Sequence, residues 1–199
     1  MLAYITWHHP AREVDPAAYE HAIGHFHSSL AHRPPSGFAG SASFRAAELP
    51  WLTAPGSGPS EPPGGYEDWY LLDSWSALGV LEEACVSHGH LRAHDAVASK
   101  CDVSTGAVYR MSEGQPRLGD ARVSVWVTPA REHEHPSIEA LLGDGMDPAT
   151  AGLWRRCLGL GPAPEYGLVA PEPPAGVAAT RLPAGWSATV SRKEVLWSG

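Results

Sequence analysis

Residues 65–85, GYEDWYLLDSWSALGVLEEAC, predict one strand that leads directly into one helix. The aromatic and aliphatic run at 66–72 has the length and composition of a strand, and a Gly-Gly pair precedes it. Either Asp73 or Ser74 supplies the side-chain oxygen that caps the following helix. The apolar residues that then recur at helical spacing are Ala77, Leu81 and Ala84. This stretch indicates a fold more clearly than a reaction.

The chain on either side of this stretch alternates strands and helices. Asp15-Pro16 is a helix-start signal, with Asp as N-cap and Pro at the first helical position. The order predicted up to Gly114 is therefore β-α-β-β-α-β. The predicted elements are strand 2–8, helix 16–31, strand 37–46, the strand and helix of 66–85, a further helical piece at 91–100, and strand 106–111.

The second half of the chain echoes the first. WHHPARE at 7–13 is matched by WVTPARE at 126–132, with Trp, Pro, Ala, Arg and Glu in the same places. Such a match suggests a duplication, which divides the chain into units 1–114 and 121–199. The elements predicted for the second unit are strand 122–128, helices 137–142 and 148–158, and strands 166–170, 177–182 and 186–197.

A β-α-β-β-α-β order is the ferredoxin-like arrangement, an antiparallel sheet with both helices on one face. Together with a Trp-Tyr-hydrophobic strand before a capped helix, it resembles the dimeric α/β-barrel superfamily. That group includes the antibiotic-biosynthesis-monooxygenase-like, EthD-like and chlorite-dismutase-like families. The resemblance implies tandem ferredoxin-like repeats whose sheets close a barrel, within a monomer as an internal pseudo-dimer or between two chains as a homodimer. It also implies a small-molecule pocket between sheet and helices, but no particular reaction.

Composition narrows the class of partner. The net charge of −8 and a pI near 5.7 argue against nucleic acid or an anionic membrane surface, which both need a basic footprint. No apolar run reaches the length of a membrane span, and the N-terminus has no signal-peptide pattern. The three cysteines are odd in number and widely spaced, which suits a reducing cytoplasm.

The 11 histidines are the outstanding feature of the composition. His21 and His25 stand four residues apart on the predicted helix, a spacing at which two imidazoles can share a metal ion. Glu20 is one carboxylate that could serve as a third ligand. The alternative is a solvated face, because the buried stripe of the same helix leaves both histidines on the solvent side. That stripe consists of Tyr19, Ile23, Phe26 and Leu30.

The motifs predict no cofactor. The HExxH and CxxC metal signatures are absent, and so are the glycine-rich loops that cradle dinucleotides or phosphates. A nucleophilic serine motif is also missing. Some members of the superfamily bind haem, but no matching motif carries over to this sequence. A metal or haem site that uses clustered histidines therefore stays as an alternative to a cofactor-free site.

The candidate catalytic residues lie on the first and third predicted strands. His8 and His9 end the first strand, where a histidine beside a pocket is a plausible general base and the alternative is a solvated turn residue. We select His9, with Asp68 and Trp69, as the catalytic set. The residues predicted to line a substrate pocket are Trp7, Tyr70 and Trp75 as aromatic walls, and Arg45 as a partner for a substrate carboxylate.

Three functions fit these patterns. The favoured one is a small-molecule-binding protein or enzyme, oxygenase- or isomerase-like, in secondary metabolism or catabolism. It predicts an apolar cavity lined by Trp69, Trp75 and a histidine. A non-catalytic assembly or partner-binding protein predicts a sheet face packed solid by side chains. A metal- or haem-binding protein predicts convergent histidines with supporting carboxylates.

Overall fold

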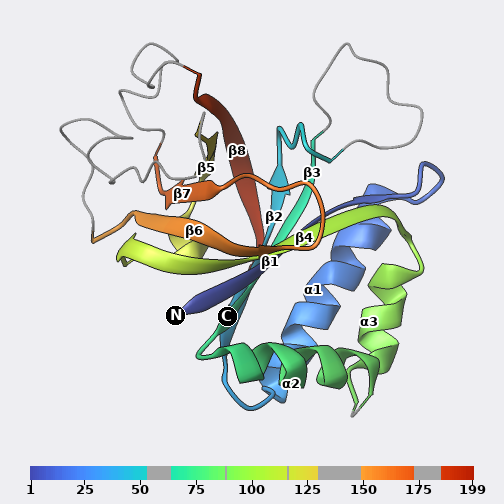
Figure 1. The fold of residues 1–199 in the computed structure, drawn as a ribbon. Helices are drawn as coiled ribbons and strands as arrows, with labels where there is room; N and C mark the ends of the chain where they lie inside the picture. The colour runs from blue at the N-terminus through green and yellow to red at the C-terminus, as the bar shows by residue number, and fades with distance from the viewer. Residues whose placement is uncertain (53–63, 88, 116, 130–148, 173–184) are drawn as a thin grey trace.

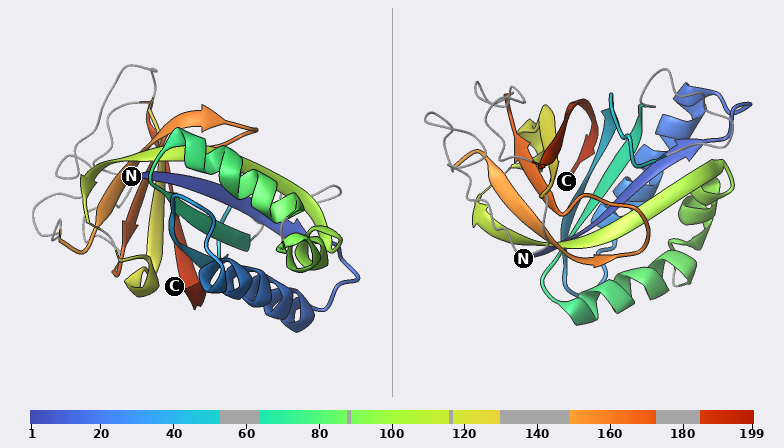
Figure 2. Two further views of the ribbon diagram at one scale, coloured as in Figure 1. Left: turned by 90° about the horizontal axis from the view of Figure 1, so that it is seen from below. Right: turned by 45° about the horizontal axis from the view of Figure 1, so that its top comes forward.

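The computed structural model describes residues 1–52, 64–87, 89–115, 117–129, 149–172 and 185–199. In these residues the chain forms a closed, antiparallel, eight-stranded barrel with three α-helices packed outside it (Figures 1 and 2). None of these helices combines the length and apolar character that crossing a membrane would need.

The first half has the predicted element order, with two consecutive helices in the second helical position. Its strands lie side by side in the order β2-β3-β1-β4, which is the ferredoxin-like order. Asp15 caps the first helix through Ala18 N–H, and Ser74 rather than Asp73 caps the second through Ala77 N–H. The elements are β1 (Leu2–Pro10), α1 (Pro16–His32), β2 (Phe38–Ala46), β3 (Gly65–Leu72), α2 (Trp75–Val86), α3 (Leu91–Ala98) and β4 (Cys101–Gly114).

The second half supplies the other four strands. Their spatial order is β6-β7-β5-β8, which corresponds strand by strand to β2-β3-β1-β4 in the first half. The pairs β2–β8 and β4–β6 join the two halves into one barrel. The tandem ferredoxin-like arrangement stays a prediction, because the segments between β5 and β6 and between β7 and β8 lie mostly outside the described residues. The elements are the 3₁₀ turn η1 (Leu118–Asp120), β5 (Val123–Thr128), β6 (Gly152–Gly159), β7 (Tyr166–Ala170) and β8 (Ser187–Ser198).

One element prediction is wrong. The helix expected at 148–158 is strand β6, which pairs with β4 on one side and β7 on the other. A short apolar run does not distinguish helix from strand by periodicity, and here the two neighbouring strands supply the hydrogen bonds that decide the conformation. The predicted helix 137–142 and strand 177–182 lie outside the described residues.

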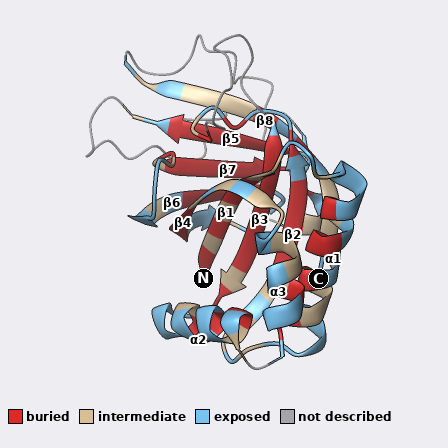
Figure 3. Cartoon of the chain, turned by 90° about the vertical axis from the view of Figure 1, so that its right-hand side faces the viewer, coloured by how far each residue is buried: buried red, intermediate tan, exposed pale blue. Residues whose placement is uncertain are grey.

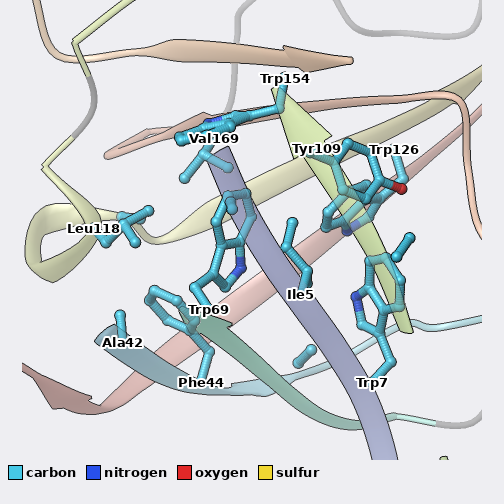
Figure 4. Close-up of a cluster of buried hydrophobic side chains, with 14 of the residues drawn as sticks. Ile5, Trp7, Ala42, Phe44, Trp69, Tyr109, Leu118, Trp126, Trp154 and Val169 are labelled. Carbon is cyan, nitrogen blue, oxygen red and sulfur yellow. The ribbon is translucent and has the colours of Figure 1, made fainter. Parts of the chain in front are cut away.

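The strands alternate between two faces, and this alternation positions the site. In β1, Ile5 and Trp7 face the barrel interior, whereas Tyr4 and His8 face the helices. The interior is filled by one aromatic-rich cluster, the barrel core, to which both halves contribute (Figure 4). The strands that enclose it consist largely of buried residues (Figure 3). Its largest members are Trp7, Phe44, Trp69, Tyr109, Trp126 and Trp154.

Candidate functional site

A buried carboxylate, Asp68, lies at the centre of the candidate site. Because β3 alternates, Glu67 and Trp69 point into the barrel and Asp68 points to the helix-covered face. His8 Nε2 on β1 lies 3.0 Å from Asp68 Oδ2, and His27 Nε2 on α1 lies 3.4 Å from Asp68 Oδ1. All three side chains are almost fully buried. One carboxylate thus joins strand β1 to helix α1 through two imidazoles.

Electrostatics keep Asp68 ionised. Burial by itself would raise the pKa of Asp68, but the two imidazoles, mainly through their charge, together lower that pKa well below its usual range. An ionised carboxylate only accepts hydrogen bonds. Nε2 of His8 therefore carries a proton and donates a hydrogen bond to Asp68.

This tautomer defines the next contact. The hydroxyl oxygen of Tyr19, from α1, lies 2.8 Å from Nδ1 of His8. In the neutral form of the ring that is protonated at Nε2, Nδ1 carries a lone pair, and Tyr19 O–H then donates to it. Burial raises the pKa of Tyr19 well above its usual value, which keeps the phenol protonated. Tyr19, His8 and Asp68 form a continuous hydrogen-bonded relay, here called the Tyr–His–Asp relay.

The second imidazole lies on the other side of the carboxylate, where His27 Nε2 and Asp68 Oδ1 are in contact at 3.4 Å without a hydrogen bond. Nδ1 of His27 lies 2.8 Å from Oγ of Ser41 on β2. The His27 ring stacks on Tyr70 with centroids 5.2 Å apart, and Tyr70 O–H also donates to Asp68 over 3.4 Å. Asp68 thus contacts His8 on β1, His27 on α1 and Tyr70 on its own strand.

A cavity of about 330 Å³ opens beside the relay, between the outer face of the sheet and all three helices. This helix-side cavity is lined by apolar and aromatic side chains on one hand and by polar ones on the other, the latter including His8, Tyr19, Asp68, Glu82 and Asp102. Burial raises the pKa of two further lining groups, Tyr4 and Cys85, to about 12 each, so both stay protonated at neutral pH. The remaining apolar and aromatic lining includes Phe26, Tyr70, Leu81 and Val97.

The structure separates the residues predicted for the site. Asp68 and Tyr70 line the helix-side cavity. Trp7 and Trp69 instead belong to the barrel core, where both indoles donate to Glu67. This is the face opposite to Asp68.

Three further predicted residues lie away from the relay. His9 and Arg45 line a different hollow at the rim of the barrel. Trp75, at the start of α2, is 43% exposed and lines neither of these two hollows. The cavity predicted from Trp69, Trp75 and a histidine is thus replaced by one that His8 and tyrosines line.

The metal prediction concerned His21 and His25, which are both exposed on α1. Within the described ranges, no group of three or more His, Cys, Asp or Glu side chains is placed to hold a metal ion. The cysteines Cys85, Cys101 and Cys157 are free thiols.

Sequence reasoning missed the role of His27 and took Tyr19 as ordinary core. A signal for His27 exists, because it follows Ile23 by four residues and Tyr19 by eight, and so extends the buried stripe of α1. A histidine on such a stripe needs a buried polar partner. The partner, Asp68, is far away in the sequence and could not be identified from spacing.

The chain is thus a mixed α/β barrel protein with a buried Tyr–His–Asp relay beside a small-molecule-sized cavity. No protein-family model matches the sequence, and no curated protein matches it. A crystal structure of a "putative monooxygenase" from Lactobacillus acidophilus NCFM is similar, with a TM-score of 0.51 and 9% sequence identity. The match covers 100% of this chain and 95% of that one. At this identity the likeness shows the fold alone.

Proposed function

We propose that the protein is an enzyme that binds a small hydroxylated aromatic molecule in the helix-side cavity and removes the proton of its hydroxyl group. The observation that carries the proposal is the buried Tyr19–His8–Asp68 relay, which lines a cavity with aromatic walls. A concave site that combines hydrophobic and aromatic walls with placed polar groups is the usual form of a small-molecule site.

The proton transfer follows from the hydrogen-bond directions. Tyr19 donates its own proton to Nδ1 of His8, so its oxygen lone pairs remain available to accept the substrate hydroxyl. The substrate proton passes to the Tyr19 oxygen as the Tyr19 proton moves to Nδ1 of His8. The imidazolium that forms is stabilised by the ionised Asp68, which keeps its charge throughout. The products are a bound phenolate and a protonated His8.

Phenolate formation makes the ring electron-rich, which prepares it either for oxidation or for isomerisation through its keto form. The description of the Lactobacillus protein as a monooxygenase supports the first course. Oxygen uptake in the presence of phenolic substrates distinguishes the two, because isomerisation consumes no oxygen.

A chromogenic phenol tests the relay directly. 4-Nitrophenol turns yellow on ionisation, so its absorbance reports the protonation state of the bound ligand. We expect binding to lower the apparent pKa of the phenol by about one unit. The Tyr19→Phe variant keeps the aromatic packing and removes only the hydroxyl, and we expect it and His8→Phe to bind the neutral, colourless form.

The matched control is His25→Phe, since His25 is exposed on the same helix. It should ionise nitrophenol as the unaltered protein does. Failure of the unaltered protein to bind the phenol, or equal ionisation by Tyr19→Phe and His8→Phe, would contradict the proposal. Circular dichroism of each variant shows whether the fold is retained.

A further inference from the structure

A second hollow lies where β1 ends and β3 begins, beside β2 and β8. This rim cavity has a volume of about 640 Å³ and shares no lining residue with the helix-side cavity. His8 faces the helix-side cavity, and the next residue, His9, lines the rim cavity. Two neighbouring histidines on one strand thus serve two different hollows, as strand alternation requires.

His9 offers an unused acceptor to the rim cavity. Its Nε2 is buried and has no hydrogen-bond partner among the described residues. In the neutral ring protonated at Nδ1, Nε2 carries a lone pair. Burial lowers the pKa of His9, so the ring is neutral at pH 7. A buried polar atom of this kind is stabilised by a ligand that donates a hydrogen bond.

One cation of the rim cavity is available to a ligand. Arg45 forms ion pairs with Glu20 and Glu194, each at 2.6 Å. The charges of Arg45 and Glu194 therefore already have partners within the protein. Lys193 is paired with Glu67 inside the barrel at 2.6 Å. Arg192 is exposed, and no carboxylate in the described part of the chain forms an ion pair with it.

The floor of the rim cavity has almost no side chains. It consists of Ala46, Ala47, Gly64 and Gly65, at the paired ends of β2 and β3. A Cβ added to Gly65 would lie 3.0 Å from the His9 ring and from the His8 carbonyl oxygen. Glycine at this position therefore allows the start of β3 to pack closely against the end of β1 and the His9 ring.

We infer that the rim cavity is a second ligand site, which takes a small planar anion that carries a hydroxyl group, of the hydroxybenzoate class. The hydroxyl donates to Nε2 of His9, the carboxylate pairs with Arg192, and the ring lies on the Ala-Gly floor. The inference does not depend on the function proposed for the helix-side cavity, since the two hollows have separate linings.

Three probes separate these contacts: 4-hydroxybenzoate has both groups, benzoate lacks the hydroxyl, and phenol lacks the carboxylate. Each is titrated into isotopically labelled full-length protein while its backbone amides are followed by two-dimensional NMR. We expect 4-hydroxybenzoate to shift the amides of Gly64, Gly65, Ala46 and Ala47. Shifts confined to helix-side residues such as Ala98 and Ser104 would overturn the inference, and so would no saturable shift at all.

Two variants assign the contacts. His9→Ala should weaken 4-hydroxybenzoate about tenfold and leave benzoate unchanged, since one hydrogen bond to a neutral acceptor is lost. Arg192→Gln should weaken both carboxylates about tenfold or more and leave phenol unchanged. The matched controls are His25→Ala and Arg155→Gln, which alter exposed residues elsewhere. Equal affinity of the controls and the two rim variants for 4-hydroxybenzoate would overturn the inference.

Discussion

Breaking the buried ion pair between Glu67 and Lys193 should strongly destabilise the barrel. Glu67 stands on β3 of the first half and Lys193 on β8 of the second, and both side chains are fully buried at an N–O distance of 2.6 Å. Glu67 also accepts from Trp69 Nε1 at 2.6 Å, Trp7 Nε1 at 3.2 Å and Ser124 Oγ at 3.4 Å. Lys193 Nζ lies 4.0 Å from the ring centre of Phe44. The perturbation is Lys193→Met, which keeps the length of the side chain and removes the charge.

The expected loss of unfolding free energy depends on the contacts that Glu67 keeps when Lys193 is replaced. Removal of one partner of a buried pair leaves the other charge uncompensated, at a cost of about 3–5 kcal/mol. Glu67 keeps three neutral donors in the variant, so we expect the lower end, about 3 kcal/mol. Glu67→Gln should cost a similar amount because it leaves the ammonium of Lys193 unpaired, although burial already lowers the pKa of Lys193 and eases loss of its proton. The double variant should lose less than the sum by about 2 kcal/mol.

The assay is equilibrium unfolding in urea at pH 7, with the two single variants and the double variant compared at a common slope. Arg155→Met is the matched control, because it removes an exposed cation from β6. A loss of under 1 kcal/mol for Lys193→Met would refute the reasoning, as would strictly additive effects in the double variant. Either result would mean that the pair is not a coupled, desolvated contact.

Two more predictions test the helix-side site and the core. Although burial opposes it, the pKa of Asp68 is lowered below its ordinary value of 3.8, so the folded protein binds fewer protons at this group than the unfolded chain. Its stabilising contribution is therefore present above pH 3.8 and is lost as the pH falls further. Because Asp68→Asn removes the titrating group, it should flatten the decline of melting temperature below about pH 4. An unchanged acid decline would contradict this. Gly167→Ala would place a Cβ 2.5 Å from the Trp126 ring, so it should cost about 1–3 kcal/mol in urea unfolding, whereas Gly24→Ala, with open space around it, should cost nothing.

The sequence predicted the first half of the fold because its signals are local. Each signal depends on residues that are close together in the chain. This holds for the Asp15-Pro16 cap, the buried stripe of α1 and the alternation along the strands. Strand β6 was not predictable in the same way, because its hydrogen bonds come from β4 and β7. Those partners are distant in the chain, and tertiary pairing overrides the weak local preference of residues 152–159.

The site was only half predictable for a related reason. Alternation along β3 establishes that Asp68 and Trp69 point to opposite faces, but it does not say which face lies under the helices. An indole fits either a barrel core or a pocket wall, so composition could not assign Trp69. The histidine signal was real, yet the residues that matter are His8 and His27, which contact Asp68 from different elements.

The adjacent acids Glu67 and Asp68 point to opposite faces of β3 and have different roles. Glu67 joins the two halves of the barrel through Lys193 and accepts hydrogen bonds from the indoles of Trp7 and Trp69. It lines none of the cavities found among the described residues. Asp68 joins a strand to a helix and borders a cavity, so its cost of burial is offset by two imidazoles that can also move protons. A buried ion pair with no access to ligand serves the fold, whereas one beside a cavity can serve chemistry. Because strand alternation sends these neighbours to opposite faces, substitutions at position 67 should act on barrel stability, and those at position 68 on ligand ionisation and on the pH dependence of stability.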